Sequence, residues 1–105
     1  MSRVKYIYKV FTALEWQKVK NEKIIKIGSQ LNDIDFVHLS TKNQVAGTIK
    51  KYYSDEENLV IIKLKVDDIK DILIWEKSRN NQYFPHCYGC FPTRIILDIK
   101  NINNE

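Results

Sequence analysis

The sequence predicts an α+β domain with more strands than helices. Both segments with clear helical signals lie in the first half of the chain, whereas the second half consists mostly of strand-like segments. Such segregation favours an α+β architecture with two main helices over a doubly wound parallel sheet. A length of 105 residues suits a single domain that spans residues 1–105.

The amino-terminal part predicts a strand followed directly by a helix. Residues 5–11 are rich in β-branched and aromatic types, which favour a strand. Thr12 and Glu15 then have the spacing of a capping box, in which each side chain accepts a hydrogen bond from a backbone N–H at the start of a helix. The first helix is therefore expected to begin at Thr12.

A second strand and helix are predicted around the first histidine. Residues 34–39 form an extended, alternating segment that places Phe36 and His38 on the same face. Thr41 and Gln44 repeat the capping-box spacing, which predicts that the second helix starts at Thr41. His38 would then lie at the end of a strand, next to the amino terminus of a helix.

The second half of the chain predicts strands that are separated by turns. Apolar residues alternate with lysines between Leu59 and Val66, which is typical of a strand with one solvent-facing side. The Phe84–Pro85 step favours extended backbone, and Asn80 and Asn81 are turn residues. The expected elements are a strand over 59–66, a helical turn over 67–71, a short strand over 73–75, a last strand over 93–99 and a frayed tail over 101–105.

The composition describes a globular, basic chain. Lysines and arginines number 17 against 13 aspartates and glutamates, which gives a net charge of +4. The lysines are spread along the chain with no block longer than Lys50–Lys51, whereas nucleic-acid-binding surfaces usually concentrate charge. We therefore expect no DNA partner, keep an RNA end as a weaker alternative, and interpret the lysines as solvated side chains on exposed faces.

No membrane or export segment is expected. The longest apolar run, Leu59–Ile62, falls far short of the ~18 residues that suggest a membrane span. The amino terminus lacks the apolar core and the cleavage site of a secretory signal. These observations predict a cytoplasmic protein without a membrane partner.

The run from Phe36 to Thr41 combines several kinds of ligand-binding group. An imidazole can exchange a proton near neutral pH, and backbone N–H groups at a helix start attract anions. We interpret His38 as a catalytic residue, and Ser40 and Thr41 as ligand-binding residues for a phosphate or a ribose. The simpler alternatives are a structural histidine and hydroxyls that only cap the helix.

A second polar and aromatic cluster lies between Trp75 and Gly89. The planar guanidinium group of Arg79 can bind phosphate or carboxylate, and Glu76 is a candidate acid or base. Both are therefore candidate catalytic residues. The simpler alternative is a surface ion pair between these two side chains. If the two clusters meet in the fold, they form one site. The remaining ligand-binding candidates are Trp75, Phe84, His86 and Tyr88.

Cys87 and Cys90 have the Cys-x-x-Cys spacing of a redox pair or of half a zinc site. The pair precedes Phe91–Pro92 and a strand, whereas redox use normally requires the first cysteine at a helix amino terminus. Only His38 and His86 remain as further zinc ligands, and His86 is adjacent to Cys87. We therefore predict two reduced, partly buried thiols and no metal site.

Together these residues resemble the domain of unknown function 952 family of small bacterial proteins. The resemblance covers most of the chain, and it departs at Asp35, where a glycine is usual, and at Cys90, where a proline is usual. The matching runs are Ile7-Tyr8-Lys9-Val10, Thr12-Ala13 with Glu15-Trp16, Phe36-Val37-His38-Leu39-Ser40-Thr41, Gln44-Val45, Trp75-Glu76 with Ser78-Arg79, Phe84-Pro85-His86 with Tyr88-Gly89, and Pro92.

The resemblance implies a fold like that of the ADP-ribosyltransferases, with two small, mostly antiparallel sheets around a nucleotide cleft. Residues 37–40 are also similar to a Val-His-Leu-Ser run in RNA 2′-phosphotransferases. In that group a strand histidine meets the ribose, which would be His38 here. A glutamate or an arginine acts at the reaction centre, which would be Glu76 or Arg79.

The expected function is binding of a nucleotide or a phosphorylated ribose, of the NAD, ADP-ribose or 2′-phosphate type. NAD would then be a substrate, and no resident cofactor is expected. The enzymatic form of this hypothesis is a transferase of the ADP-ribosyltransferase or RNA 2′-phosphotransferase type. The alternatives are a noncatalytic binding module and an accessory protein whose motifs only stabilise the fold.

Overall fold

The computed structural model of the chain describes residues 4–26 and 35–103. Its helices and strands confirm the α+β prediction. In chain order they are β1 (Tyr6–Thr12), α1 (Ala13–Val19), β2 (Ile24–Ile25), β3 (Val37–His38), α2 (Val45–Tyr52), β4 (Asn58–Lys65), α3 (Val66–Ile69), the 3₁₀ helix η1 (Lys70–Ile72), β5 (Leu73–Lys77), η2 (Arg79–Asn81), β6 (Tyr83–Cys87), β7 (Phe91–Pro92), η3 (Thr93–Ile95) and β8 (Asp98–Asn103).

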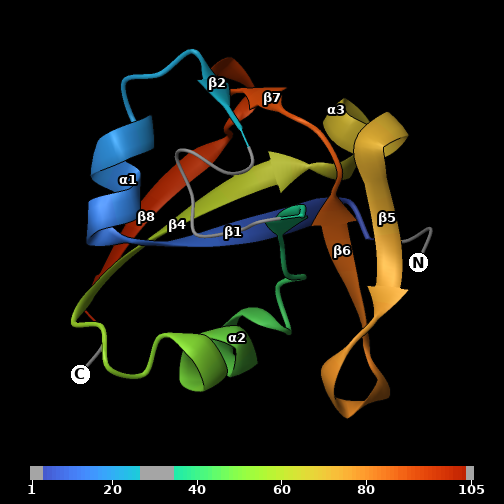
Figure 1. The fold of residues 1–105 in the computed structure, drawn as a ribbon, viewed down its shortest axis with the longest axis horizontal. Helices are drawn as coiled ribbons and strands as arrows, with labels where there is room; N and C mark the ends of the chain where they lie inside the picture. Colours follow the sequence, from blue (N-terminus) through green and yellow to red (C-terminus); the bar gives the residue numbers. More distant parts are fainter. Residues whose placement is uncertain (1–3, 27–34, 104–105) are drawn as a thin grey trace.

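The described strands form two three-stranded sheets, with the orders β1-β4-β8 and β3-β6-β5, and a short β2-β7 pair. Every strand pair is antiparallel. Figure 1 shows β1, β4 and β8 crossing the middle of the molecule, with β5 and β6 beside one end of these strands. The two expected sheets are therefore accompanied by a third, two-residue pair.

The first helix begins where the capping box predicts. Thr12 is the N-cap, and its hydroxyl accepts a hydrogen bond from the backbone N–H of Glu15 at 3.1 Å. The Glu15 carboxylate accepts the reciprocal bond from the backbone N–H of Thr12 at 3.0 Å. Both bonds use partners three residues apart, so the local sequence is sufficient to specify this helix start.

The second helix starts three residues later than predicted, because its N-cap is Gln44 instead of Thr41 and its first residue is Val45. The Gln44 side chain accepts a bond from the backbone N–H of Thr41, but the N–H of Gln44 bonds the Thr41 carbonyl instead of its hydroxyl. The Gln44 amide also donates to the Tyr83 carbonyl at 2.8 Å, a partner far along the chain. Residues 41–44 are thereby held in a turn, and the prediction that Thr41 caps this helix is wrong.

The histidine strand is shorter than predicted, because only Val37–His38 is paired as β3. Residue 34 lies outside the described residues. The predicted alternation is confirmed, since Val37 is buried in the core and His38 is exposed. Register places His38 opposite His86 of β6.

In the second half, the predicted strand over 59–66 corresponds to β4, and the helical turn and the short strand correspond to α3 with η1 and to β5. The last strand is displaced. Thr93 donates from its hydroxyl to the Glu22 and Lys23 carbonyls and starts a 3₁₀ turn, so the strand β8 begins only at Asp98. The expected frayed tail from residue 101 is wrong as far as Asn103, because β8 pairs with β4 up to that residue.

Among residues 4–26 and 35–103, one hydrophobic core joins the sheets. Its buried members come from both three-stranded sheets and from α1, and they include Phe11, Val19, Val37, Ile62 and Cys87. The two sheets also meet at a backbone bridge, in which Tyr8 and Ser40 exchange N–H to carbonyl bonds of 2.8 Å. This bridge places the middle of β1 beside the end of β3.

No helix among residues 4–26 and 35–103 is long and apolar enough to cross a membrane.

Candidate functional site

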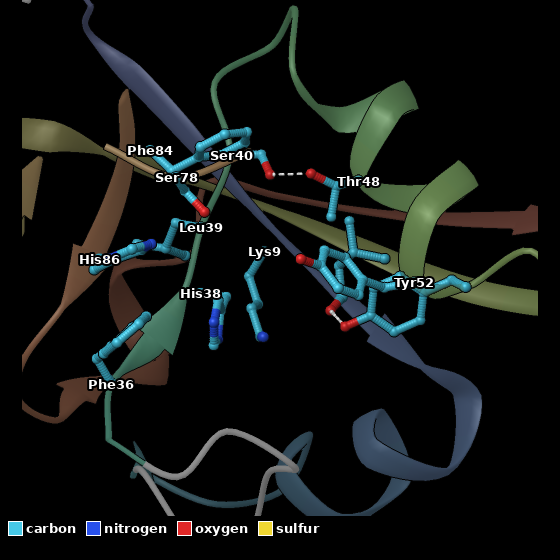
Figure 2. A pocket seen from close by; sticks show the side chains of 12 residues that line it. Lys9, Phe36, His38, Leu39, Ser40, Thr48, Tyr52, Ser78, Phe84 and His86 are labelled. Carbon is cyan, nitrogen blue, oxygen red and sulfur yellow. Dashed lines mark hydrogen bonds between the residues drawn. The ribbon is translucent and has the colours of Figure 1, made fainter. Parts of the chain in front are cut away.

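A cavity of about 350 Å³ lies where β1, the end of β3, α2 and β6 come together. Figure 2 shows its wall, in which hydroxyl, imidazole and aromatic side chains surround the Lys9 side chain. The lining residues are Lys9, Val10, Phe36, His38, Leu39, Ser40, Thr48, Tyr52, Tyr53, Ser78, Phe84 and His86.

Lys9 is buried beneath this cavity, with only 1% of its surface exposed. It shares the core-facing side of β1 with Ile7 and Phe11, and its Nζ lies 5.8 Å from the centroid of the Phe11 ring. Figure 2 shows the side chain between His38 and Tyr52. The interpretation of the lysines as solvated surface side chains is therefore wrong for Lys9. The position of Lys9 on the same face of the strand as Ile7 and Phe11 could have indicated that it is buried.

The structure brings the two histidines together at the cavity. The rings of His38 and His86 meet edge to face, with centroids 5.5 Å apart. Phe36 stacks on His86 at a centroid distance of 4.0 Å and contacts the His38 ring at 4.5 Å. His38 is exposed, whereas His86 is 7% exposed, so the pair reaches from the surface into the wall.

Glu76 is hydrogen-bonded to His86 and orients its ring. Register and alternation place both side chains on the same face of the β3-β6-β5 sheet. The Glu76 Oε1 atom accepts bonds from the Tyr88 hydroxyl at 2.6 Å and from His86 Nδ1 at 2.7 Å. Glu76 does not line the cavity itself, so it acts on the cavity only through His86.

These hydrogen bonds shift the pKa values of the Glu76 carboxyl group and the Tyr88 phenol. The bonds from Tyr88 and then from His86 lower the pKa of the Glu76 carboxyl below its usual value. The hydrogen bond that the Tyr88 hydroxyl donates to this carboxylate raises the pKa of Tyr88 to about 12, because ionisation of the phenol would remove the bond. Glu76 is therefore a carboxylate near neutral pH, and Nδ1 of His86 donates the hydrogen bond.

The backbone around Arg79 is described, but its side chain lies outside the described part of the structure. Arg79 begins η2, directly after Ser78, which lines the cavity. Asn80 and Asn81 follow with φ angles of 57° and 60°, a left-handed conformation that asparagine tolerates. The predicted turn at these asparagines is confirmed, and the catalytic role of Arg79 stays a prediction.

Other predicted ligand-binding residues fall into two groups. Ser40 and Phe84 line the cavity, and the Ser40 hydroxyl is hydrogen-bonded to that of Thr48 at 2.8 Å. Trp75 lies on the opposite face from Glu76 and packs against the hydrophobic core, and Thr41 is not part of the lining. We therefore leave Trp75 and Thr41 out of the candidate site.

Several lining side chains were missed by the sequence interpretation. For Phe36, its alternation with His38 was a sufficient signal, and Tyr52 follows the helical stripe of Val45 and Ile49. Thr48 and Ser78 carried no signal, because only the packing of α2 and η2 brings them to the cavity. The missed lining residues are Val10, Phe36, Leu39, Thr48, Tyr52, Tyr53 and Ser78, in addition to Lys9.

Both cysteines are free thiols, and they occupy different environments. Cys87 is buried in the core, whereas Cys90 is exposed, so the prediction of two partly buried thiols holds only for Cys87. Burial raises the pKa of the Cys87 thiol to about 11. Across residues 4–26 and 35–103, no three His, Cys, Asp or Glu side chains are grouped to hold a metal ion.

These observations define a small α+β domain with a polar and aromatic cavity where its sheets join. The chain belongs to the DUF952 family, whose description is "Protein of unknown function" and whose family model matches residues 10–99. No curated protein matches the chain.

The fold is similar to that of protein CC0527 from Caulobacter crescentus. Its crystal structure matches with a TM-score of 0.82 and 26% sequence identity, over 93% of this chain and 86% of that protein. Its solution NMR structure matches with a TM-score of 0.76 and 25% identity, over 93% and 84% of the two chains.

Proposed function

We propose that the cavity binds a nucleotide or a phosphorylated ribose, of the NAD, ADP-ribose or 2′-phosphate type. The observation that carries the proposal is the buried Lys9 beneath a cavity whose wall holds two imidazoles and stacked aromatic rings. Each part of such a ligand has a matching feature in the cavity.

The negative charge of a phosphate matches the charge of Lys9. Burial strengthens the electrostatic field of the Lys9 ammonium group because the surroundings have a low dielectric constant. Lys9 therefore attracts an anionic group in the cavity without a direct contact. Hydroxyl groups at the wall, from Ser78 and Tyr52, supply hydrogen-bond donors for phosphate or ribose oxygens.

The planar base of a nucleotide matches the aromatic wall. Phe36 and His86 form a stacked pair with an interplanar angle of 22°, and Phe84 and Tyr52 also line the cavity. Stacking of a base on aromatic side chains contributes about 1–3 kcal/mol and does not require a particular base. The wall is therefore suited to nucleotides in general.

The size of the cavity favours the smaller members of this ligand class. Ligand pockets span about 300–1,000 Å³, and a volume of about 350 Å³ is near the lower limit. A mononucleotide or a phosphorylated ribose suits this volume better than the whole of NAD.

The enzymatic form of the proposal is transfer chemistry on an ADP-ribosyltransferase-like fold, with NAD or a 2′-phosphorylated RNA end as substrate. His38 would meet the ribose, and Glu76 through His86, or Arg79, would act at the reaction centre. The noncatalytic form is a module that binds the same group without turnover. Support for catalysis comes from the ordered Glu76–His86 pair at the cavity wall.

A thermal-shift experiment with matched ligands tests this proposal. A ligand at 100 times its Kd adds about 2.7 kcal/mol of stability, which moves the midpoint of a domain of this size by several degrees. We expect AMP, 2′-AMP or ADP-ribose to raise the midpoint and adenosine to raise it much less, because adenosine lacks the phosphate.

Lys9→Met and Lys65→Met are the matched pair of variants. Both remove one positive charge from the sheet of β1 and β4, but Lys65 is exposed and is not part of the lining. We expect Lys9→Met alone to abolish the shift. The proposal is wrong if no nucleotide or phosphate ligand shifts the midpoint, or if both variants respond as the wild type does.

A further inference from the structure

We propose that His38 and His86 are an acid–base pair that hydrolyses nucleoside 2′,3′-cyclic monophosphates in this cavity. The inference rests on the proposed nucleotide-binding function and adds to it a substrate class and a reaction. Hydrolysis of a cyclic phosphodiester needs one group that takes a proton from water, one that gives a proton to the departing ribose oxygen, and a positive charge near the phosphate.

Two imidazoles at one cavity supply the proton-transfer groups. Antiparallel register places His38 directly opposite His86, and both side chains point to the cavity side of the sheet. Their ring centroids are 5.5 Å apart. A phosphate group held at the pair therefore has a different imidazole within reach of the attacking water and of the leaving oxygen.

Glu76 determines which nitrogen of His86 exchanges the proton. The Nδ1 atom donates to the Glu76 carboxylate at 2.7 Å, so in the neutral ring the second nitrogen, Nε2, carries the lone pair. Stacking on Phe36 and the second bond of Glu76, from the Tyr88 hydroxyl, hold this arrangement. His86 is thereby oriented as the base, and Glu76 is a positioning residue. His38, the second imidazole of the pair, is assigned as the acid.

Lys9 and the cavity size select the cyclic monophosphate. A cyclic diester carries one negative charge, which the electrostatic field of the buried Lys9 beneath the cavity favours. The volume of about 350 Å³ suits a mononucleotide and not a polynucleotide chain. The aromatic wall accepts the base, as in the proposed binding function.

The reaction balances with water as the only co-reactant. His86 Nε2 takes a proton from water, and the water oxygen forms a bond to phosphorus. One phosphorus–oxygen bond of the ring breaks, and the released ribose oxygen takes a proton from the His38 imidazolium. The product is a nucleoside 2′- or 3′-monophosphate, and proton exchange with solvent restores both histidines.

Phosphorus NMR of the full chain with adenosine 2′,3′-cyclic monophosphate tests the inference. We expect conversion to the monoester, with a bell-shaped dependence of kcat/KM on pH because one imidazole must be neutral and the other protonated. The substitutions His38→Gln and His86→Gln should each lower kcat by about 10²–10⁴-fold, the usual contribution of a general acid or base. Glutamine at position 86 retains an amide donor for Glu76, so folding is expected to survive; circular dichroism checks this.

Two further variants test the positioning role of Glu76 and control for the loss of a positive charge outside the cavity. Glu76→Gln should lower kcat with little change in KM and should shift the acidic limb of the pH profile, which reports the base His86, whereas a purely structural role of Glu76 would leave the profile in place. Lys65→Met should retain wild-type turnover, because Lys65 lies outside the cavity.

The outcomes distinguish this inference from the proposed function. Binding of AMP without hydrolysis of the cyclic nucleotide rejects the acid–base inference and leaves nucleotide binding intact. Hydrolysis that persists at the wild-type rate in both histidine variants also rejects the inference. Absence of both binding and hydrolysis overturns the two proposals together.

Discussion

The rings of Phe36 and His86 stack with their centroids 4.0 Å apart and their planes inclined by 22°. Phe36 precedes β3, whereas His86 belongs to β6, so this contact joins the two polar and aromatic clusters of the sequence. Phe36 also contacts the rings of His38 and Tyr88, at 4.5 and 5.1 Å. It is the centre of a four-ring cluster beside the cavity.

Replacement of Phe36 by leucine should weaken this cluster without removing its apolar volume. Aromatic pairs contribute about 0.5–1.5 kcal/mol beyond the burial of their surface. We expect Phe36→Leu to lower the free energy of unfolding by about that amount in urea denaturation, and Phe36→Tyr to retain most of it. Equal stability of the leucine variant and the wild type would show that the stack is not stabilising.

The Tyr88 phenol should titrate at a higher pH than an unperturbed tyrosine does. Its pKa is raised to about 12 from 10.0, chiefly by its hydrogen bond to Glu76. Because the folded chain holds this proton more tightly, the pair contributes stability below pH 10 that is lost as the pH rises toward 12. Carbon-13 NMR of labelled tyrosine rings can measure this, with Tyr88→Phe assigning the signal. Glu76→Gln should return the late signal toward 10; an unchanged signal would contradict the assigned cause.

The same hydrogen bonds should make the protein sensitive to acid. The pKa of Glu76 is lowered from 4.5 by its bonds from Tyr88 and His86. A lowered folded-state pKa contributes stability above 4.5 that is lost as the pH falls through the folded value. Between about pH 5 and pH 3, the wild type should lose more stability in urea than Glu76→Gln does. The control is Glu57→Gln, at an exposed residue, which should follow the wild type.

The two thiols should differ in reactivity. Cys87 is buried and its pKa is raised to about 11, so little thiolate forms at pH 8, whereas Cys90 is exposed. A colorimetric thiol reagent should therefore titrate one thiol rapidly in the native protein and the second only after unfolding. Cys90→Ser should remove the rapid phase. Rapid reaction of both thiols in the native state would show that Cys87 is accessible.

The capping box at the start of α1 should contribute more to the free energy of unfolding than the similar sequence before α2. Loss of an N-cap hydroxyl costs about 0.5–2 kcal/mol, and we expect that decrease in unfolding free energy for Thr12→Ala. Thr41→Ala is the matched control, because Thr41 does not cap α2 and should change stability by no more than about 0.5 kcal/mol. The opposite ranking in urea denaturation would contradict the assigned helix starts.

The features that the sequence predicted correctly depend on contacts between near neighbours. The capping box of Thr12 and Glu15 closes over three residues, and the alternation around His38 follows from the two-residue period of a strand. The left-handed turn at Asn80 and Asn81 is a property of asparagine itself. Local sequence therefore determined the α+β class, the start of α1 and the face on which His38 lies.

The features that only the tertiary structure decided depend on partners far along the chain. The amide of Gln44 bonds the carbonyl of Tyr83, which holds residues 41–44 in a turn and delays α2. The bridge between Tyr8 and Ser40 brings Lys9 beside the end of β3, where a lysine that looks solvated in the sequence becomes the buried cation of the cavity. A pattern of neighbouring residues carries no information about which distant segment packs on it, so the assembly of the cavity required the folded chain.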